Sequence, residues 1–332
     1  MTERVASGSA DQRRVDQRSV ISALELAAHA PSVHNSQPWR FVLGRTTVHL
    51  YADVDRWLPA TDADRRDLVL SCGIVLHHMR IALAAAGIRA TVHRLPNPDE
   101  PDHLAALELW PEPPADADLG LASAIPRRRT DRRRFTDWEI PRGFLDELAD
   151  AAAGHGALVR HVAEARGRWL LLEAIREAAE AQAADPANRT ETALWSGRVA
   201  DDTGVPAANL LREPGGTSRR FTAGLLEQPE APEEDGAALL VLGTTSDDRL
   251  SQLRAGESAS AVLLRATELG LATCPLSQPL EVADTRATIR DAVLGGTLCP
   301  QLLLRVGWAP LGSEPPPTPR RPIAQVIERR DG

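Results

Sequence analysis

The stretch HAPSVHNSQPWRF, residues 29–41, places a run of polar side chains between two apolar segments. The apolar run 20–28 predicts a helix over roughly 19–30, and Pro31 ends it because proline removes a backbone donor and clashes with the preceding turn. Pro38, Trp39 and Phe41 then return the chain to apolar sequence. A plain loop would need only Gly or Asp, so the hydrogen-bonding side chains at 32–37 indicate a specific role.

The composition limits the class of protein. The chain has 332 residues, of which 43% are hydrophobic, and this length favours two domains or two halves of one. The net charge of −8 argues against a general nucleic-acid or membrane surface. Three cysteines without CxxC spacing favour a reducing cytoplasm over a disulfide scaffold or a metal site. We find no signal peptide and expect no membrane-spanning run.

Hydrophobic periodicity predicts the main elements. In the first part we expect two short strands around a Gly-Arg turn within 39–53, a long buried helix over 61–87 and strands at 88–95 and 104–110. Thr61 or Asp62 can cap the long helix. A Pro-rich link, 111–120, follows. In the second part we expect helices near 143–153, 167–184 and 251–270, and strands at 237–244 and 300–308.

The two parts repeat weakly. An apolar helix runs from Gly73 to Gly87 in the first and from Gly256 to Gly270 in the second, and a strand ending in tryptophan follows each. Chance similarity between two alanine-rich helices could explain the spacing alone. The shared order of helix, glycine, strand and tryptophan favours duplication.

Three further segments are candidates for a site. RRRTDRRRF, 127–135, is either a solvated linker or nucleic-acid patch, or a cluster for a phosphate monoester, because guanidiniums and a hydroxyl match that group. GLATCPLSQPLE, 270–281, follows the second long helix, and residues 275–278 within it predict a loop at the helix end. PRRP, 319–322, predicts an extended tail. We expect His77 and His78 to be core or interface residues, because adjacent helix positions do not face one site. The sequence contains no phosphate-binding glycine loop and no GxSxG elbow.

Taken together, these segments resemble the nitroreductase family of FMN-dependent oxidoreductases. APSVHNSQPWRF resembles the family's APSxxNxQPWxF, and RRRTDRRRF resembles its RRSxRxF. LGLATCPLSQ is similar to LGLGTCPIGG, and LLRVGWAP with PRRP resembles the family's closing strand and basic pair. In the ordinary family the RRS motif precedes APSxxNxQPW, whereas here APSVHNSQPW precedes RRRTDRRRF. This order resembles that of the family's tandem, fused Acg-like subgroup. The resemblance implies an α+β nitroreductase-like fold in which halves 1–124 and 125–332 form an intramolecular pseudo-dimer.

The resemblance also implies one FMN site shared by the halves. The second half would supply the phosphate and ring contacts, and the first half the polar loop. The implied cofactor-binding residues are Arg128, Arg129, Thr130, Arg132, Pro275, Leu276, Ser277, Arg320 and Arg321, with Pro31, Ser32, His34, Asn35 and Gln37. The reciprocal site is expected to be inactive, because Gln17-Arg18-Ser19 is a poor RRS and AAAGHGALV, 151–159, replaces the polar loop.

Two functions follow from the resemblance. In the first, NAD(P)H reduces FMN, which then reduces a nitroaromatic or quinone-like acceptor. The protein supplies position and electrostatics, so no catalytic side chain is assigned. In the second, a lid over about 185–236 covers the flavin, and the protein stores FMN or senses redox state, because this segment is too long for an ordinary connection. We expect a monomer without a nucleic-acid partner.

Overall fold

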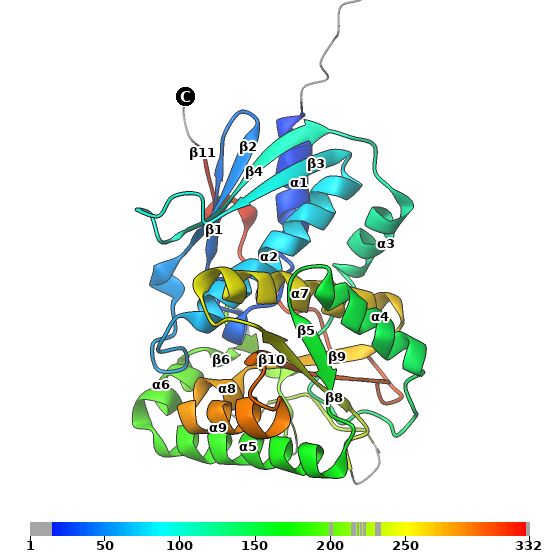
Figure 1. Cartoon of the computed structure of the whole chain (residues 1–332). Coiled ribbons are helices and arrows are strands. Elements are labelled where there is room, and N and C mark those ends of the chain that lie inside the picture. The colour runs from blue at the N-terminus through cyan, green and yellow to red at the C-terminus, as the bar shows by residue number, and fades with distance from the viewer. Residues whose placement is uncertain are drawn as a thin grey trace, which may run out of the picture.

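A computed structural model describes residues 15–198, 202–213, 217, 219, 221, 224–229 and 234–329. Parts of the predicted lid, among them 199–201, 214–216 and 230–233, lie outside these residues. The architecture is α+β. Two mixed helix and sheet layers lie one above the other, and two long helices, α2 (Arg66–Ala85) and α7 (Arg249–Glu268), pass between them (Figure 1).

The first sheet has the strand order β11-β1-β2-β4-β3. Its members are β1 (Trp39–Leu43), β2 (Thr47–Ala52), β3 (Ile88–Arg94), β4 (His103–Pro111) and, from the far end of the chain, β11 (Ile327–Arg329). The first four pair antiparallel, whereas β11 pairs parallel with β1. The chain therefore ends beside its first strand, at the top of Figure 1. The tail brings segment 319–322 to the first half.

The second sheet has the order β5-β8-β10-β9, with β5 (Leu158–His161), β8 (Ala238–Thr244), β9 (Ala272–Leu276) and β10 (Cys299–Gly307). All its pairs are antiparallel. In chain order and pairing these strands correspond to β1, β2, β3 and β4. The predicted repeat is therefore present as a repeated strand topology.

The helices α2 and α7 meet at two glycines. A Cβ on Gly73 would lie 2.1 Å from the carbonyl oxygen of Leu253, and a Cβ on Gly256 would lie 2.1 Å from that of Leu70. Residues 73 and 256 are 183 positions apart in the sequence, and so are residues 70 and 253. Each helix therefore meets the other with equivalent residues, as in an isologous interface. The predicted contact between the two long helices is confirmed.

The remaining helices cover the sheets. The first half adds α1 (Gln17–Ala27) and α3 (Asp116–Ala124), and the second adds α4 (Arg142–Ala153), α5 (Ala165–Ala184), α6 (Pro186–Leu194), α8 (Gln278–Glu281) and α9 (Ala283–Thr288). One hydrophobic core joins α1, α2 and α7 to both sheets. A smaller core lies between the second sheet, α5, α8 and the short helical segment Ile289–Val293 that follows α9, at the bottom of Figure 1.

The structure corrects several expectations. The link 111–120 contains the start of α3, and the predicted loop at Pro275 belongs to β9, an edge strand where proline costs no ladder bond. By length and composition α2 could cross a membrane, contrary to our expectation, but 78% of that span is buried inside the protein. His77 and His78 both reach the Ser260 hydroxyl, at 2.8 and 2.7 Å, so these adjacent residues do share a contact.

Candidate functional site

The polar loop after α1 is fixed by its own hydrogen bonds. The Ser32 hydroxyl accepts from the Gln37 amide (2.9 Å), and the Ser71 hydroxyl of α2 accepts from the Val33 amide (3.2 Å). His34, Asn35 and Gln37 all have positive φ, at 47°, 54° and 51°. Non-glycine residues rarely adopt this conformation, and where they do the surroundings must hold them there. The loop is thus a preformed structure rather than a simple connection.

This loop forms one wall of a cavity of about 90 Å³ between the two halves. The opposite wall comes from the segment around Thr130 and from the end of β9. Eight predicted site residues line the cavity together: Pro31, Ser32, His34, Thr130, Arg132, Pro275, Leu276 and Ser277. The prediction missed the floor, where α2 contributes Asp67, Ser71 and Ile74, and the cover, where Arg219 and Phe221 contribute.

Three arginines gather beside this cavity. Arg128 is only 6% exposed, and its guanidinium approaches the Thr130 hydroxyl at 3.4 Å. Burial and the neighbouring Arg320, Arg129 and Arg132 lower the pKa of Arg128 to about 9. Burial and Arg129 likewise lower the pKa of Arg320 to about 10. Among the described residues no carboxylate forms an ion pair with these three arginines, and the Nε of each is buried without a partner.

An arginine group of this kind requires an anion. Buried charges in proteins are normally paired, and guanidinium forks match phosphate and carboxylate oxygens. Arg129 and Arg320 use part of their donors on backbone carbonyls, which orients them, but carbonyls do not neutralise the charge. The arginine cluster, Arg128, Arg129 and Arg320, is therefore a candidate phosphate subsite.

Arg132 and His34 face the cavity itself. The Arg132 guanidinium donates to the Asn209 carbonyl (3.1 Å) and lies 5.3 Å from the Phe221 ring centre. The His34 ring meets Phe221 edge-on at 5.3 Å, and neither of its nitrogens has a hydrogen-bond partner. Burial, with the cations Arg219 and Arg132, holds the pKa of His34 well below its usual range, so its ring is neutral.

Six predicted residues do not line the cavity: the three of the arginine cluster, and Asn35, Gln37 and Arg321. Asn35 donates to the carbonyls of Gly204 (3.0 Å) and Pro319 (3.2 Å). Gln37 donates to the Asp202 carbonyl (2.7 Å) and accepts from the Arg321 amide (2.8 Å). These side chains join the polar loop to the tail and to the 185–236 segment.

Arg321 is also set apart from the arginine cluster. Its guanidinium forms an ion pair with Asp53 at 3.3 Å and donates to the Gln37 carbonyl at 3.2 Å. The tail therefore separates its two arginines, with Arg320 in the cluster and Arg321 anchored to the first half. The PRRP sequence alone does not distinguish Arg320 from Arg321, because Asp53, the ion-pair partner of Arg321, is distant in sequence.

These residues fit FMN in polarity and charge. The arginine cluster has unpaired charge for a phosphate, and His34 and Asn35 retain unpartnered polar atoms for a ring or a ribityl chain. The cavity volume is smaller than the roughly 300 Å³ at which small-molecule pockets begin. A flavin ring therefore requires side chains in the lining, which include Arg219 and Phe221, to move.

Two positions related to the cavity lining form an ion pair. A shift of 183 residues, which relates Gly73 to Gly256, also relates Ile74 to Glu257 and Ser277 to Arg94. Glu257 is fully buried and accepts two hydrogen bonds from Arg94, at 2.6 and 2.8 Å. Where the cavity is lined by an apolar side chain and a hydroxyl, the related positions hold an ion pair.

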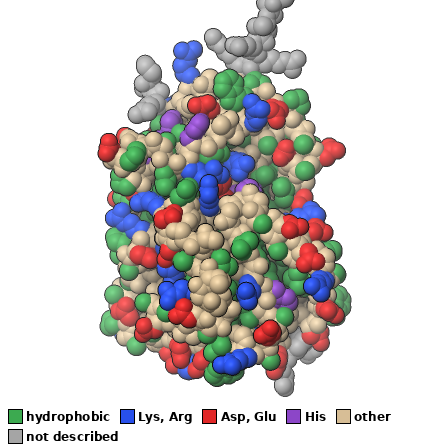
Figure 2. Space-filling model, viewed as in Figure 1, with side chains coloured by type: hydrophobic (Ala, Val, Ile, Leu, Met, Phe, Trp, Pro, Cys, Tyr) green, Lys and Arg blue, Asp and Glu red, His purple; other side chains and the backbone are tan. Residues whose placement is uncertain are grey.

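Other ligand classes find less support. Among the described residues no group of three or more His, Cys, Asp or Glu side chains is arranged to hold a metal ion. Figure 2 shows acidic and basic side chains interspersed over the visible face, with no extended basic area there. Nucleic-acid binding would need such an area, because phosphate neutralisation dominates its affinity.

Comparison with known proteins identifies the family. The chain is 45% identical over 322 residues to the "Putative NAD(P)H nitroreductase Rv3131" of Mycobacterium tuberculosis, covering 94% of this chain and 92% of that protein. It is 39% identical to the same organism's "Putative NAD(P)H nitroreductase acg", covering 93% and 95%. No protein-family model matches. The chain belongs to the Acg-like family of NAD(P)H nitroreductases.

Solved structures also match. The FMN-dependent nitroreductase NfnB of Mycobacterium smegmatis, in complex with NADPH, is 17% identical with a TM-score of 0.40. The match covers 64% of this chain and 99% of that one. A nitroreductase with bound FMN from Desulfitobacterium hafniense is 16% identical with a TM-score of 0.41, covering 63% and 97%.

Proposed function

We propose that this protein is an FMN-binding oxidoreductase of the nitroreductase type, with one FMN between halves 1–124 and 125–332. NAD(P)H would supply two electrons, and a nitroaromatic or quinone-like acceptor would receive them. The observation that carries the proposal is the arginine cluster, three guanidiniums to which no described carboxylate is paired, beside a cavity lined by both halves. The names of its relatives agree with this activity.

The residues divide the work of holding FMN. Arg128, Arg129 and Arg320 would bind the phosphate, and Thr130 the adjacent ribityl chain. The polar loop 31–35 and the end of β9 would enclose the ring from opposite halves. Arg132, whose charge faces the cavity, would stabilise negative charge on the reduced ring. Bound FMN itself supplies the hydride-transfer chemistry.

A single site per chain is part of the proposal. The buried pair of Arg94 and Glu257 supports it, because these side chains occupy the positions related to Ile74 and Ser277. The reciprocal helix contact within one chain supports a monomer, since this contact would otherwise join two subunits.

Storage or sequestration of FMN is the second candidate, and Phe221 favours it. Its ring stacks edge-on against His34 and beside Arg132, over the cavity. Arg219 forms an ion pair with Glu281 of α8, which ties this cover to the cavity's edge. If these contacts persist with FMN bound, a nicotinamide ring cannot reach the flavin.

The absorption spectrum of the purified protein tests both candidates. A flavin spectrum that bleaches with NADPH or NADH under anaerobic conditions supports the oxidoreductase. A spectrum that bleaches only with dithionite supports storage. A protein that holds no flavin and takes up no added FMN would refute both.

A matched pair of variants tests the phosphate assignment. Arg128→Ala should weaken FMN binding roughly 10- to 100-fold, because a hydrogen bond to a charged group contributes about 1.5–3 kcal/mol. Arg127→Ala removes the same charge from an exposed neighbour and should leave the affinity unchanged. Equal affinity in the two variants would contradict the assignment.

A further inference from the structure

A buried carboxyl stands in the floor of the cavity. Asp67 of α2 is 2% exposed. One of its carboxylate oxygens accepts from the Arg66 guanidinium at 2.7 Å, and the other, Oδ2, is buried without a hydrogen-bond partner. Ser71 lies one turn further along the same wall and donates to the Asp67 carbonyl at 2.6 Å. No hydrogen bond within the described part of the chain therefore accounts for this oxygen.

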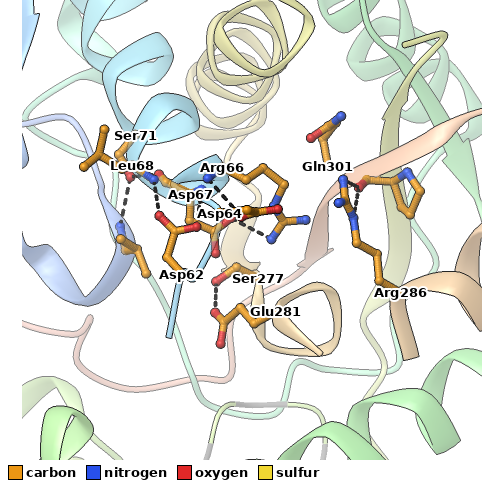
Figure 3. A network of polar contacts seen from close by, with 12 residues as sticks. Asp62, Asp64, Arg66, Asp67, Leu68, Ser71, Ser277, Glu281, Arg286 and Gln301 are labelled. Atoms are coloured by element: carbon orange, nitrogen blue, oxygen red, sulfur yellow. Dashed lines mark hydrogen bonds and ion pairs between the residues drawn. The ribbon is translucent and has the colours of Figure 1, made fainter. Parts of the chain in front are cut away.

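Asp67 lies between two cavities. On its far side is a cavity of about 360 Å³ whose lining includes Asp62, Asp64, Arg66 and Glu281. The Asp62 carboxylate accepts from the Asp67 and Leu68 amides, at 2.9 and 2.8 Å, in the first turn of α2, although Arg65 and not Asp62 occupies the N-cap position. Figure 3 shows these acidic side chains around Arg66, with Ser277 and Glu281 facing them from the second half. Asp62 and Asp64 therefore line the outer cavity, whereas Asp67 lines the inner one.

The surrounding charges favour a proton in this network. Asp62, Asp64 and Arg66 face Asp67 from the start of α2, Glu281 faces it from α8, and Arg219 from the 185–236 segment. Burial raises the pKa of Asp67 to about 6, with Arg66 and Arg219 opposing and Glu281 adding. Burial and Asp67 raise the pKa of Asp62 to about 8. Because the two interact, they titrate as a pair that still holds a proton near neutral pH.

We infer that Asp67 is the proton donor of the inner cavity. This inference rests on the proposed reductase function. Reduction of a quinone to a hydroquinone needs two electrons and two protons. The hydride supplies both electrons and one hydrogen nucleus. The Asp67 O–H bond breaks as an O–H bond forms on the second quinone oxygen, and the carboxylate left behind recovers a proton from solvent.

The position of Asp67 suits this role. General acid catalysis requires a protonated group within hydrogen-bond reach of the reacting atom. Asp67 lines the cavity, and its Oδ2 has no hydrogen-bond partner among the described residues. His34 shares the wall, but its ring is neutral with a low pKa, so it is not the acid.

The test compares Asp67→Asn with Asp64→Asn. Both remove one carboxyl from the network, but Asp64 lines only the outer cavity. Protein reduced with one equivalent of dithionite is mixed with p-benzoquinone, and the flavin absorbance is followed from pH 5 to pH 9. In wild type and in Asp64→Asn, the rate of flavin reoxidation should fall as pH rises through the range in which Asp62 and Asp67 titrate. Asp67→Asn should be about 100-fold slower at low pH, the lower end of general acid contributions, and independent of pH.

Infrared titration of the flavin-free protein gives an independent readout. Wild type should show the C=O band of a buried protonated carboxyl near neutral pH, and the part of that band assigned to Asp67 should vanish in Asp67→Asn. An Asp67→Asn protein that binds flavin and keeps the wild-type rate and pH profile overturns the inference. If that variant does not fold, absence of the band from wild type overturns it. A wild type that binds no flavin refutes the proposed function instead.

Discussion

Substitution of Gly256 by alanine tests the helix crossing on which the whole site depends. The added Cβ would lie 2.1 Å from the Leu70 carbonyl oxygen and 2.7 Å from the Gly73 Cα. Both atoms belong to the backbone of α2, so no side-chain rotation can relieve the contact. Non-bonded carbon atoms sit about 3.5–4.0 Å apart, so the helices must separate by about 1 Å or more.

The magnitude follows from two opposing effects. Overpacking a well-packed core costs about 1–3 kcal/mol, and an unyielding backbone contact belongs at the upper end of that range. Alanine recovers about 1 kcal/mol of helix propensity relative to glycine. The expected net loss is about 2 kcal/mol in the free energy of unfolding. Displacing α2 also moves Leu70, Ser71 and Ile74, which line the cavity, so FMN affinity should fall with stability.

Urea denaturation, followed by circular dichroism, measures the loss. With a slope of about 3 kcal/mol per molar urea, the midpoint should fall by about 0.7 M. Gly143→Ala is the matched control, because a Cβ there, on α4, meets no atom within 4 Å. That variant should gain about 0.5–1 kcal/mol. A Gly256→Ala midpoint equal to or above that of Gly143→Ala would refute the crossing geometry.

Three more variants test separate parts of the structure. Arg320→Ala should reduce FMN affinity about tenfold or more, whereas Arg321→Ala should mainly lower the urea midpoint, because Arg321 pairs with Asp53; isothermal titration and denaturation separate the two effects. Asp62→Asn should flatten the pH dependence of the melting temperature: a raised pKa in the folded state stabilises at low pH and loses that effect as pH rises toward about 8. Glu257→Gln should cost about 3–5 kcal/mol by calorimetry, since it leaves Arg94 unpaired.

The elements predictable from sequence are those with strong local patterns. The hairpin of β1 and β2 alternates around its turn, and α2 and α7 are long apolar runs with clear ends. The polar loop at 31–37 was recognisable because so many hydrogen-bonding side chains have no local structural need. Asp62 was a candidate cap by spacing alone, and it accepts from the first turn of α2.

The features that sequence could not supply depend on distant partners. The three residues of β11 have no strand signal of their own and gain one only by pairing with β1. Nothing near Arg321 indicates Asp53, and nothing near Asp67 indicates that this residue lines a cavity. Phe221 lies in a polar, Gly- and Pro-rich segment, so its place over His34 follows from tertiary packing alone.

The asymmetry between the two halves follows from connectivity as much as from substitution. The segment after β10 crosses to the first sheet as β11 and carries Arg320 into the arginine cluster. The strand β5, which corresponds to β1, lies at an edge of its sheet. A related site beside β5 would therefore have no residue equivalent to Arg320. Its positions are then free to change, and a buried ion pair of Arg94 with Glu257 occupies two of them while stabilising the contact between the halves.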